Sequence, residues 1–198
     1  MKDLYKLPDN LPIPVDDGAC DHLHELRIPS VSLKSVSDTI IDLSSVKGMA
    51  VIFFYPMIGR PDSPPMIGWN DIPGARGCTP QSCSFRDKYS QLEKLKVKVF
   101  GVSSQPLIDQ KEASARLNLP FELLNDSQLE LAKALSLPTF EYESSTFIKR
   151  ITVISVDGVI KKTLYPVFPP DENVSDVIEW LEHNKSLNQI GAKDAPSG

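Results

Sequence analysis

Two of the three cysteines lie five residues apart, and this close pair is the chain's clearest candidate for chemistry. Cys78 follows Gly77 at the end of a long loop, Cys83 comes five positions later, and Cys20 stands apart. Three cysteines are too few for a secreted disulfide framework, and the number is odd. In a reducing compartment, a close pair is more often redox-active or metal-binding than structural.

The spacing of the pair favours peroxide chemistry over other thiol chemistries. Thioredoxin-type exchange uses Cys-x-x-Cys, whereas this pair is Cys-x4-Cys. A zinc site needs four ligands, and the sequence offers no second cysteine pair. His22 and His24 make half a metal site, so we interpret them as part of a solvated arm. A peroxide-reducing pair needs only one low-pKa cysteine and one resolving cysteine within reach.

Several cations are near Cys78 in the sequence or in the predicted fold. A thiolate is the nucleophile, and a helix N-terminus or a nearby cation favours it. Cys78 lies in the first turn of a predicted helix, Arg76 is two residues away, and Arg86 lies two helical turns on. Arg150 heads a later strand that could neighbour the buried one. As alternatives, Arg86 could pair with Asp87, and Arg150 could form a surface salt bridge.

Helix geometry limits how Cys78 and Cys83 could join. Five residues on a helix mean roughly 140° around the axis and about 7.5 Å along it. A disulfide needs Cα atoms about 4.4–6.8 Å apart. If this pair oxidises to a disulfide, the first turns of the helix must therefore unwind.

The pair must be positioned by a strand that ends near it and a helix that begins at it. Residues 49–55 (MAVIFFY) form a nearly continuous apolar run, typical of a strand buried on both faces. Residues 56–77 are rich in proline and glycine without periodicity, which predicts a long loop. Thr79 can cap the next helix, with Pro80 at its first position, and apolar residues continue at helical spacing to Leu95.

The other elements are predicted by alternation, helical spacing and turn residues. They are two short strands around a turn at 35–38, a strand at 97–104, a helix at 106–117, a strand at 120–126, a helix opened by Ser127 over 127–136, a hairpin over 150–165 turning at Asp157-Gly158, and a helix at 171–183. Alternating strands and helices imply an α/β fold with a mixed sheet covered on both faces. Ligands bind such sheets at the carboxyl ends of strands, where the cysteine pair falls.

Composition and charge limit the possible functions. The chain has 198 residues, 41% of them apolar, and a net charge of −5, which argues against binding to nucleic acid or an anionic membrane. No apolar run approaches the roughly 20 residues of a membrane span. The N-terminus has Asp and Pro where a signal peptide would be apolar, so we expect a cytoplasmic protein. We expect an extended arm over 1–26, one domain over 27–185 and a tail over 186–198.

Three segments resemble one protein family. GCTPQSCSFRD at 77–87 is similar to the active-site stretch of the bacterioferritin comigratory protein, or Q-type, peroxiredoxins. FFYP at 53–56 resembles the strand end before that site, and RITVISVDGVI at 150–160 resembles the family's late Arg-headed strand. The resemblance, which runs from about Arg27 to His183, implies a thioredoxin-like fold with an N-terminal hairpin.

The same resemblance implies a thiol-dependent peroxidase. Cys78 matches the peroxidatic cysteine, and Cys83 matches the resolving cysteine that forms an intramolecular disulfide with it. Arg150 matches the arginine that orients thiolate and peroxide, and Pro56 matches the active-site proline. The implied substrates are hydrogen peroxide and organic hydroperoxides, and the implied reductant is thioredoxin or a glutaredoxin-type dithiol protein. No metal or organic cofactor is implied, and the protein is expected to be a monomer or a homodimer.

The chain departs from the family at two places. The family has Thr or Ser three residues before the peroxidatic cysteine, whereas this chain has Ala75; we hypothesise that Thr79 or Ser63 supplies the hydroxyl. The family loop is short, whereas 57–72 reads as an insertion of about sixteen residues. Its apolar residues could pack on the domain, or form a rim that selects bulky hydroperoxides or docks a reductase or a second subunit: Met57, Ile58, Met66, Ile67 and Trp69.

Two other functional classes stay open at this point. One is a dithiol oxidoreductase acting on protein disulfides, against which the x4 spacing weighs. The other is a non-catalytic redox sensor that uses a Cys78–Cys83 switch, which Ala75 favours. Cys20 is interpreted as a bystander thiol, with an alternative disulfide partner as the competing view.

Overall fold

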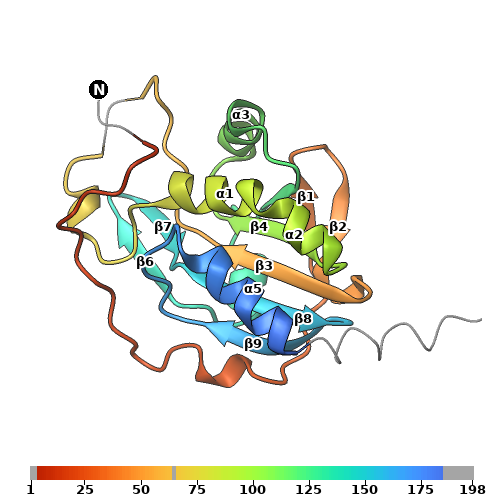
Figure 1. Ribbon diagram of the computed structural model, residues 1–198. Helices are drawn as coiled ribbons and strands as arrows, with labels where there is room; N and C mark the ends of the chain where they lie inside the picture. The colour runs from red at the N-terminus through yellow and green to blue at the C-terminus, as the bar shows by residue number, and fades with distance from the viewer. Residues whose placement is uncertain (1–3, 64–65, 185–198) are drawn as a thin grey trace, which may run out of the picture.

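A seven-stranded mixed sheet forms the centre of the computed structural model, which describes residues 4–63 and 66–184. Its strand order is β2–β1–β5–β4–β3–β8–β9 (Figure 1). The strands are β1 (Ser32–Ser35), β2 (Ile40–Asp42), β3 (Met49–Phe54), β4 (Lys98–Ser103), β5 (Glu122–Asn125), β8 (Ile151–Val156) and β9 (Val159–Leu164). β3, β4 and β5 are parallel, and the other pairings are antiparallel. The α/β fold with a mixed sheet, expected from the sequence, is confirmed.

Helices cover both faces of this sheet. They are α1 (Cys78–Asp87), α2 (Tyr89–Lys94), α3 (Leu107–Leu117), α4 (Glu130–Ala134) and α5 (Asn173–His183), with short 3-10 turns η1 (Asp21–Leu23), η2 (Leu43–Ser45) and η3 (Trp69–Asp71). α1, α2, α3 and α5 contribute to one buried cluster, and α4 with the N-terminal segment contributes to the other. Figure 1 shows α1 and α5 side by side across the sheet.

β3 is the central strand of the core, as its apolar run predicts. All six of its residues are buried, because alternate side chains enter the two clusters on opposite faces. Phe53 stacks on Phe85 of α1 with ring centroids 4.7 Å apart, whereas Phe54 packs on the other face. Full burial of such a ring stabilises the fold by about 1.5–3 kcal/mol. This packing fixes the start of α1 against the end of β3.

The start and the length of α1 differ from the prediction. The helix begins at Cys78 with Gly77 as its N-cap, and Thr79 makes no capping hydrogen bond. Gly77 has φ 111°, a left-handed conformation that its missing Cβ allows. The single helix expected through Leu95 is broken at Lys88 into α1 and α2.

The helix expected to open at Ser127 begins later. α4 starts at Glu130, and the buried Asp126 carboxylate accepts from the N–H groups of Leu131 (3.2 Å) and Ala132 (2.9 Å). Ser127 bonds back to Asn125 instead. A carboxylate that accepts from two amides caps a helix better than one hydroxyl, which explains the shift.

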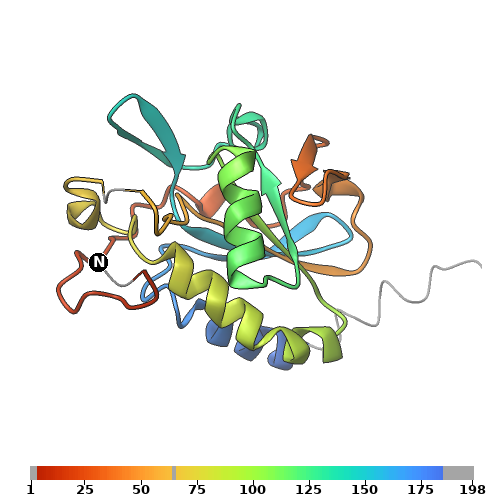
Figure 2. The same cartoon turned by 90° about the horizontal axis from the view of Figure 1, so that it is seen from above.

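A second hairpin, absent from the prediction, follows α4. β6 (Thr139–Tyr142) and β7 (Ser145–Ile148) form a separate two-stranded sheet. Figure 2 shows this hairpin standing away from the main sheet. Ser104, just after β4, donates its hydroxyl to the Thr146 carbonyl (2.9 Å). The hairpin is thereby attached at the carboxyl end of β4.

The N-terminal segment is extended, as its prolines predict, but it is not solvated throughout. Cys20 and Leu23 are buried, and His22 Nε2 lies 2.8 Å from the Leu135 carbonyl oxygen. Asp17 accepts from Lys149 and Tyr165, and these bonds lower the pKa of its carboxyl to about 2. The expected tail at 186–198 lies outside the described residues. No helix in the described ranges is long and apolar enough to cross a membrane.

Candidate active site

Cys78 lies where the end of β3 meets the first turn of α1, as predicted. Its side chain is buried, with 3% exposure, and its sulfur accepts from the Met57 N–H at 3.4 Å. The Sγ also lies 3.6 Å from the Ala75 carbonyl oxygen, to which the thiol can donate. The unpaired N–H groups of a first helical turn favour negative charge nearby. The location therefore suits a thiolate.

Arg150, which is 3% exposed, provides the cation at this sulfur. It directly precedes β8, which pairs with β3, and its Nη2 donates to Cys78 Sγ at 3.2 Å. The same nitrogen donates to the carbonyls of Gly74, Ala75 and Arg76 at 3.2–3.3 Å. Among the described residues, no carboxylate pairs with this guanidinium. The Cys78 thiolate is therefore its available counter-ion.

A buried polar network holds Arg150 from behind. Its Nη1 donates to the Gln81 amide oxygen, and Gln81 Nε2 donates to Asn173 Oδ1 at 3.0 Å. Thr152 donates its hydroxyl to the same Asn173 oxygen at 2.7 Å. All four side chains are buried. Because buried polar groups are costly when unpaired, this network restricts the guanidinium to one orientation.

Cys83 lies on α1, about one and a half turns after Cys78, and both thiols are free. It is half-buried, and this burial raises the pKa of its thiol, although the nearby Arg86 opposes the rise. Arg86 itself donates to Asp87 (2.8 Å) and to the Leu117 carbonyl (2.8 Å). The pairing of Arg86 with Asp87 is one of the alternatives expected from the sequence. The intact helix keeps the two sulfurs from bonding.

The remaining predicted residues are also near Cys78. Thr79 and Ser63 line the same cavity as Cys78, and Thr79 is buried. Ala75 is buried and presents only its carbonyl to Arg150. Pro56 follows β3, and its carbonyl accepts from the Ser103 hydroxyl at 2.8 Å. Pro56 therefore connects the ends of β3 and β4.

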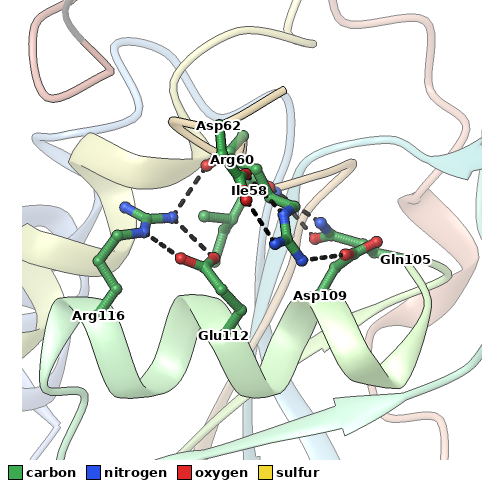
Figure 3. Close-up of polar contacts among 8 residues, drawn as sticks. Ile58, Arg60, Asp62, Gln105, Asp109, Glu112 and Arg116 are labelled. Carbon is green, nitrogen blue, oxygen red and sulfur yellow. Dashed lines mark hydrogen bonds and ion pairs between the residues drawn. The ribbon is translucent and has the colours of Figure 1, made fainter. Parts of the chain in front are cut away.

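The segment after Pro56 is anchored to α3 and to the end of β4 (Figure 3). The Gln105 side chain brackets Ile58, accepting from its N–H at 3.0 Å and donating to its carbonyl at 2.9 Å. Arg60 donates to Asp109 (3.1 Å), and Arg116 donates to the Gly59 carbonyl (3.0 Å). These bonds hold 58–60 in a defined position.

A partly open cavity lies above Cys78. Its volume is about 650 Å³. The walls come from the N-terminal segment, from 57–72 and from the start of α1, and their apolar members include Leu4, Met57, Ile58, Met66 and Trp69. Of the apolar residues predicted in 57–72, only Ile67 faces outward, with 91% exposure.

The other candidate groups lie apart from this site. Cys20 is in the cluster on the opposite face of the sheet from Cys78, and burial raises the pKa of its thiol to about 12. Within 4–63 and 66–184, no three His, Cys, Asp or Glu side chains could hold a metal ion together.

The sequence interpretation missed Gln81, Asn173 and Gln105. Gln81 carried a usable signal, because a residue three positions after Cys78 lies on the same helical face. Asn173 carried none, since its contact with Gln81 spans 92 residues. Gln105 likewise acts through a contact that is distant in sequence.

Comparison with known proteins finds a matching family model and similar sequences. The Redoxin family model matches residues 25–180. Peroxiredoxin Q, chloroplastic, of Oryza sativa subsp. japonica is 28% identical over 156 residues, covering 78% of this chain and 64% of the relative. The match therefore spans just under two thirds of that protein's length.

Solved structures share the fold. Peroxidoxin BcpB from Mycobacterium tuberculosis superimposes with a TM-score of 0.67 at 21% identity, covering 81% of this chain and 97% of that one. The bacterioferritin comigratory protein of Xanthomonas campestris gives 0.64 at 18% identity, covering 89% and 99%. The thioredoxin-like arrangement expected from the resemblance is thus confirmed.

Proposed function

Because the chain belongs to the redoxin family, we propose that it is a thiol peroxidase of the peroxiredoxin Q kind. The observation that carries this proposal is the buried Cys78 sulfur, which receives hydrogen bonds from the Arg150 guanidinium and the Met57 amide. Relatives named peroxiredoxin Q support it, as does the alkyl peroxide reduction activity of the Xanthomonas campestris neighbour.

In the first step, the Cys78 thiolate attacks the terminal oxygen of a hydroperoxide. An S–O bond forms and the O–O bond breaks, so sulfur is oxidised by two electrons to a sulfenic acid. The alkoxide or hydroxide that leaves takes a proton from water and departs as an alcohol or as water. Arg150 is suited to stabilise the charge that moves from sulfur to the leaving oxygen.

In the second step, Cys83 attacks the Cys78 sulfenic acid. The S–S bond forms, the S–O bond breaks, and the oxygen leaves as water after taking the Cys83 proton. This requires the first turns of α1 to unwind, because the helix separates the two residues. Unwinding also removes the burial that raises the Cys83 pKa, so this thiol becomes reactive when it is needed.

A dithiol partner then supplies two electrons to reduce the disulfide. We assign this role to thioredoxin or a glutaredoxin-type protein, and we place the reaction in the cytoplasm, where such reductants keep thiols reduced. No metal or organic cofactor takes part in these steps. The assembly proposed from the sequence, a monomer or a homodimer, is testable by light scattering.

We further propose that the Thr79 hydroxyl replaces the one that Ala75 lacks. Thr79 is buried beside Cys78 in the same cavity, whereas Ser63 is exposed. Thr79→Val is expected to slow oxidation of Cys78 about tenfold, the value of roughly one hydrogen bond to a charged group, while Thr79→Ser keeps most of the rate. If Thr79→Val matches the parent and Ser63→Ala is slow, the hydroxyl comes from Ser63.

The peroxidase proposal is tested by adding one equivalent of hydrogen peroxide to the reduced protein and mapping its cysteines by peptide mass spectrometry. A Cys78–Cys83 disulfide is the expected product. Cys83→Ser should stop at the Cys78 sulfenic acid, and Cys20→Ser should behave as the parent. With excess dithiothreitol the parent should consume many equivalents of peroxide, whereas a redox sensor would consume about one. A Cys78 that stays reduced would refute the proposal.

A further inference from the structure

The cavity above Cys78 is much larger than hydrogen peroxide requires. Its volume is about 650 Å³. A water molecule occupies about 30 Å³ of liquid, so hydrogen peroxide needs roughly twice that. Cavities of about 300–1,000 Å³ hold organic ligands of tens of atoms. Most of this space is therefore unused if hydrogen peroxide is the substrate.

The walls of the cavity are mainly apolar and come from two segments outside the sheet. Met57, Ile58, Met66 and Trp69 contribute from the 57–72 segment, and Leu4 contributes from the N-terminal segment. A Cβ placed on Gly59 would lie 3.1 Å from Leu4 Cδ2, so these segments are in close contact. The N-terminal segment therefore closes the side of the cavity.

The Trp69 wall is held by the hairpin. Its ring packs edge-on against Tyr142 (centroids 5.4 Å apart) and Phe147 (5.0 Å), and tilted against Phe140 (5.8 Å). Tyr142 also donates its hydroxyl to the Ile67 carbonyl at 2.5 Å. Together with the Gln105 and Arg116 bonds described above, these contacts make a preformed wall rather than a mobile rim.

The charge of Arg60, which borders the cavity, is compensated. Arg60 pairs with Asp62 (2.8 Å) and with Asp109 (3.1 Å). Two carboxylates around one guanidinium leave no positive charge there to bind a third carboxylate. Arg76 also lines the cavity, and it donates to the Lys6 carbonyl. At the Arg60 side of the cavity, an uncharged organic group therefore fits better than a fatty-acid head group.

We propose that this cavity binds the organic group of a bulky, apolar, uncharged hydroperoxide, and that Trp69 and Leu4 determine its selection over hydrogen peroxide. This inference rests on the proposed peroxidase function, since it places the O–O bond at the Cys78 sulfur. Trp69 and Leu4 act on specificity, because they contact the organic group and not the reacting atoms.

The test compares two peroxides on one thiol. Reduced protein is mixed with cumene hydroperoxide or hydrogen peroxide, quenched with an alkylating reagent, and the unoxidised Cys78 is counted by mass spectrometry. The parent should react faster with cumene hydroperoxide. The ratio of the two rate constants should fall at least about tenfold in Trp69→Ala and severalfold in Leu4→Ala, since lost apolar contacts of this kind cost 10-fold or more.

Ile67→Ala is the matched control, because Ile67 belongs to the same segment but is 91% exposed and lies outside the cavity walls. Its ratio should equal that of the parent. Leu4→Ala keeps the test valid if Trp69→Ala does not fold. An unchanged ratio in the folded cavity variants, or a faster reaction with linoleic acid hydroperoxide than with cumene hydroperoxide, would overturn the inference. If neither peroxide oxidises Cys78 in the parent, the peroxidase function itself fails.

Discussion

Gln81 connects the helix that carries the thiol to the arginine that stabilises it. Its amide accepts from Arg150 and donates to Asn173, and all three side chains are buried. Removing a buried partner of a charged group costs more than the bond itself is worth, because the charge is left unpaired. Gln81 is therefore a positioning residue for Arg150, and its effect should appear in the rate at which Cys78 is oxidised.

Gln81→Met keeps the side-chain length but can neither accept from Arg150 nor bond Asn173. We expect oxidation of Cys78 to slow about tenfold at pH 7, because the guanidinium that stabilises charge at the sulfur is less firmly held. The rate of thiol loss after addition of peroxide measures this. Ser82→Ala is the control, since Ser82 is buried on the same turn and its hydroxyl has no partner within the described ranges. Equal rates of Cys78 oxidation in Gln81→Met and the parent would contradict the assignment.

At the scale of secondary-structure elements, Gly77 determines how α1 begins. Its φ of 111° is unfavourable for other residues, and a Cβ would lie 2.3 Å from Pro170 Cγ and 2.9 Å from Leu7 Cδ2. The helix start is thus enclosed by the N-terminal segment on one side and by the loop before α5 on the other.

Gly77→Ala is expected to lower the free energy of unfolding by about 3 kcal/mol or more, through strain and overlap together. Gly48→Ala separates the two causes, because Gly48 has φ +74° but nothing within 4 Å of the added Cβ. We expect that variant to lose only about 1 kcal/mol, the strain alone. Urea denaturation of both proteins gives the difference. Equal losses would show that the contacts of Pro170 and Leu7 do not matter.

Oxidation should change α1 more than any other element. In the reduced protein the Gln81 N–H donates to the Gly77 carbonyl at 3.0 Å as part of the helix. If Cys78 and Cys83 join, we expect hydrogen exchange in 78–87 to accelerate at least about tenfold, since local unfolding sets the exchange rate. Exchange read by mass spectrometry before and after one equivalent of peroxide measures this. Cys83→Ser should show no acceleration, and a protected α1 in the disulfide form would contradict the geometric argument.

The elements that position the thiol were predictable, because their signals are local. The apolar run of β3 and the Gly-Cys start of α1 are visible in a few residues. The β6–β7 hairpin was not, since its short strands depend on packing against Trp69, far earlier in the sequence. The cap of α4 was misassigned because Asp126, buried at the end of β5, reaches past Ser127. Burial and long-range contacts decided these cases, and neither is visible in local spacing.

At the scale of the whole molecule, Cys20 couples the N-terminal segment to the core. Burial, and then the charges of Asp17 and Asp16, raise the pKa of its thiol from 9.0 to about 12. A raised pKa in the folded state means that this thiol favours folding below pH 9. That contribution is lost as the pH rises from 9 towards 12, because the unfolded chain releases the proton first.

Cys20→Ala should therefore flatten the alkaline loss of stability. Between pH 9 and 10.5, under reducing conditions, the free energy of unfolding of the parent should fall more steeply than that of the variant. The difference in slope should be at most about 1.4 kcal/mol per pH unit, the limit for one proton. Urea titrations at both pH values measure it. Parallel curves would show that Cys20 ionises equally in both states.

The unwinding expected of α1 has a consequence for recognition by the reductant. If α1 unwinds on oxidation, the oxidised protein differs from the reduced protein in surface shape as well as in the state of its cysteines. In the oxidised protein a reductant would contact an unwound loop that carries a disulfide. In the reduced protein the same residues form an intact helix. We expect the reductant to distinguish the two by shape before any electron moves. The reductant would then transfer electrons only to protein molecules that have already reacted with peroxide.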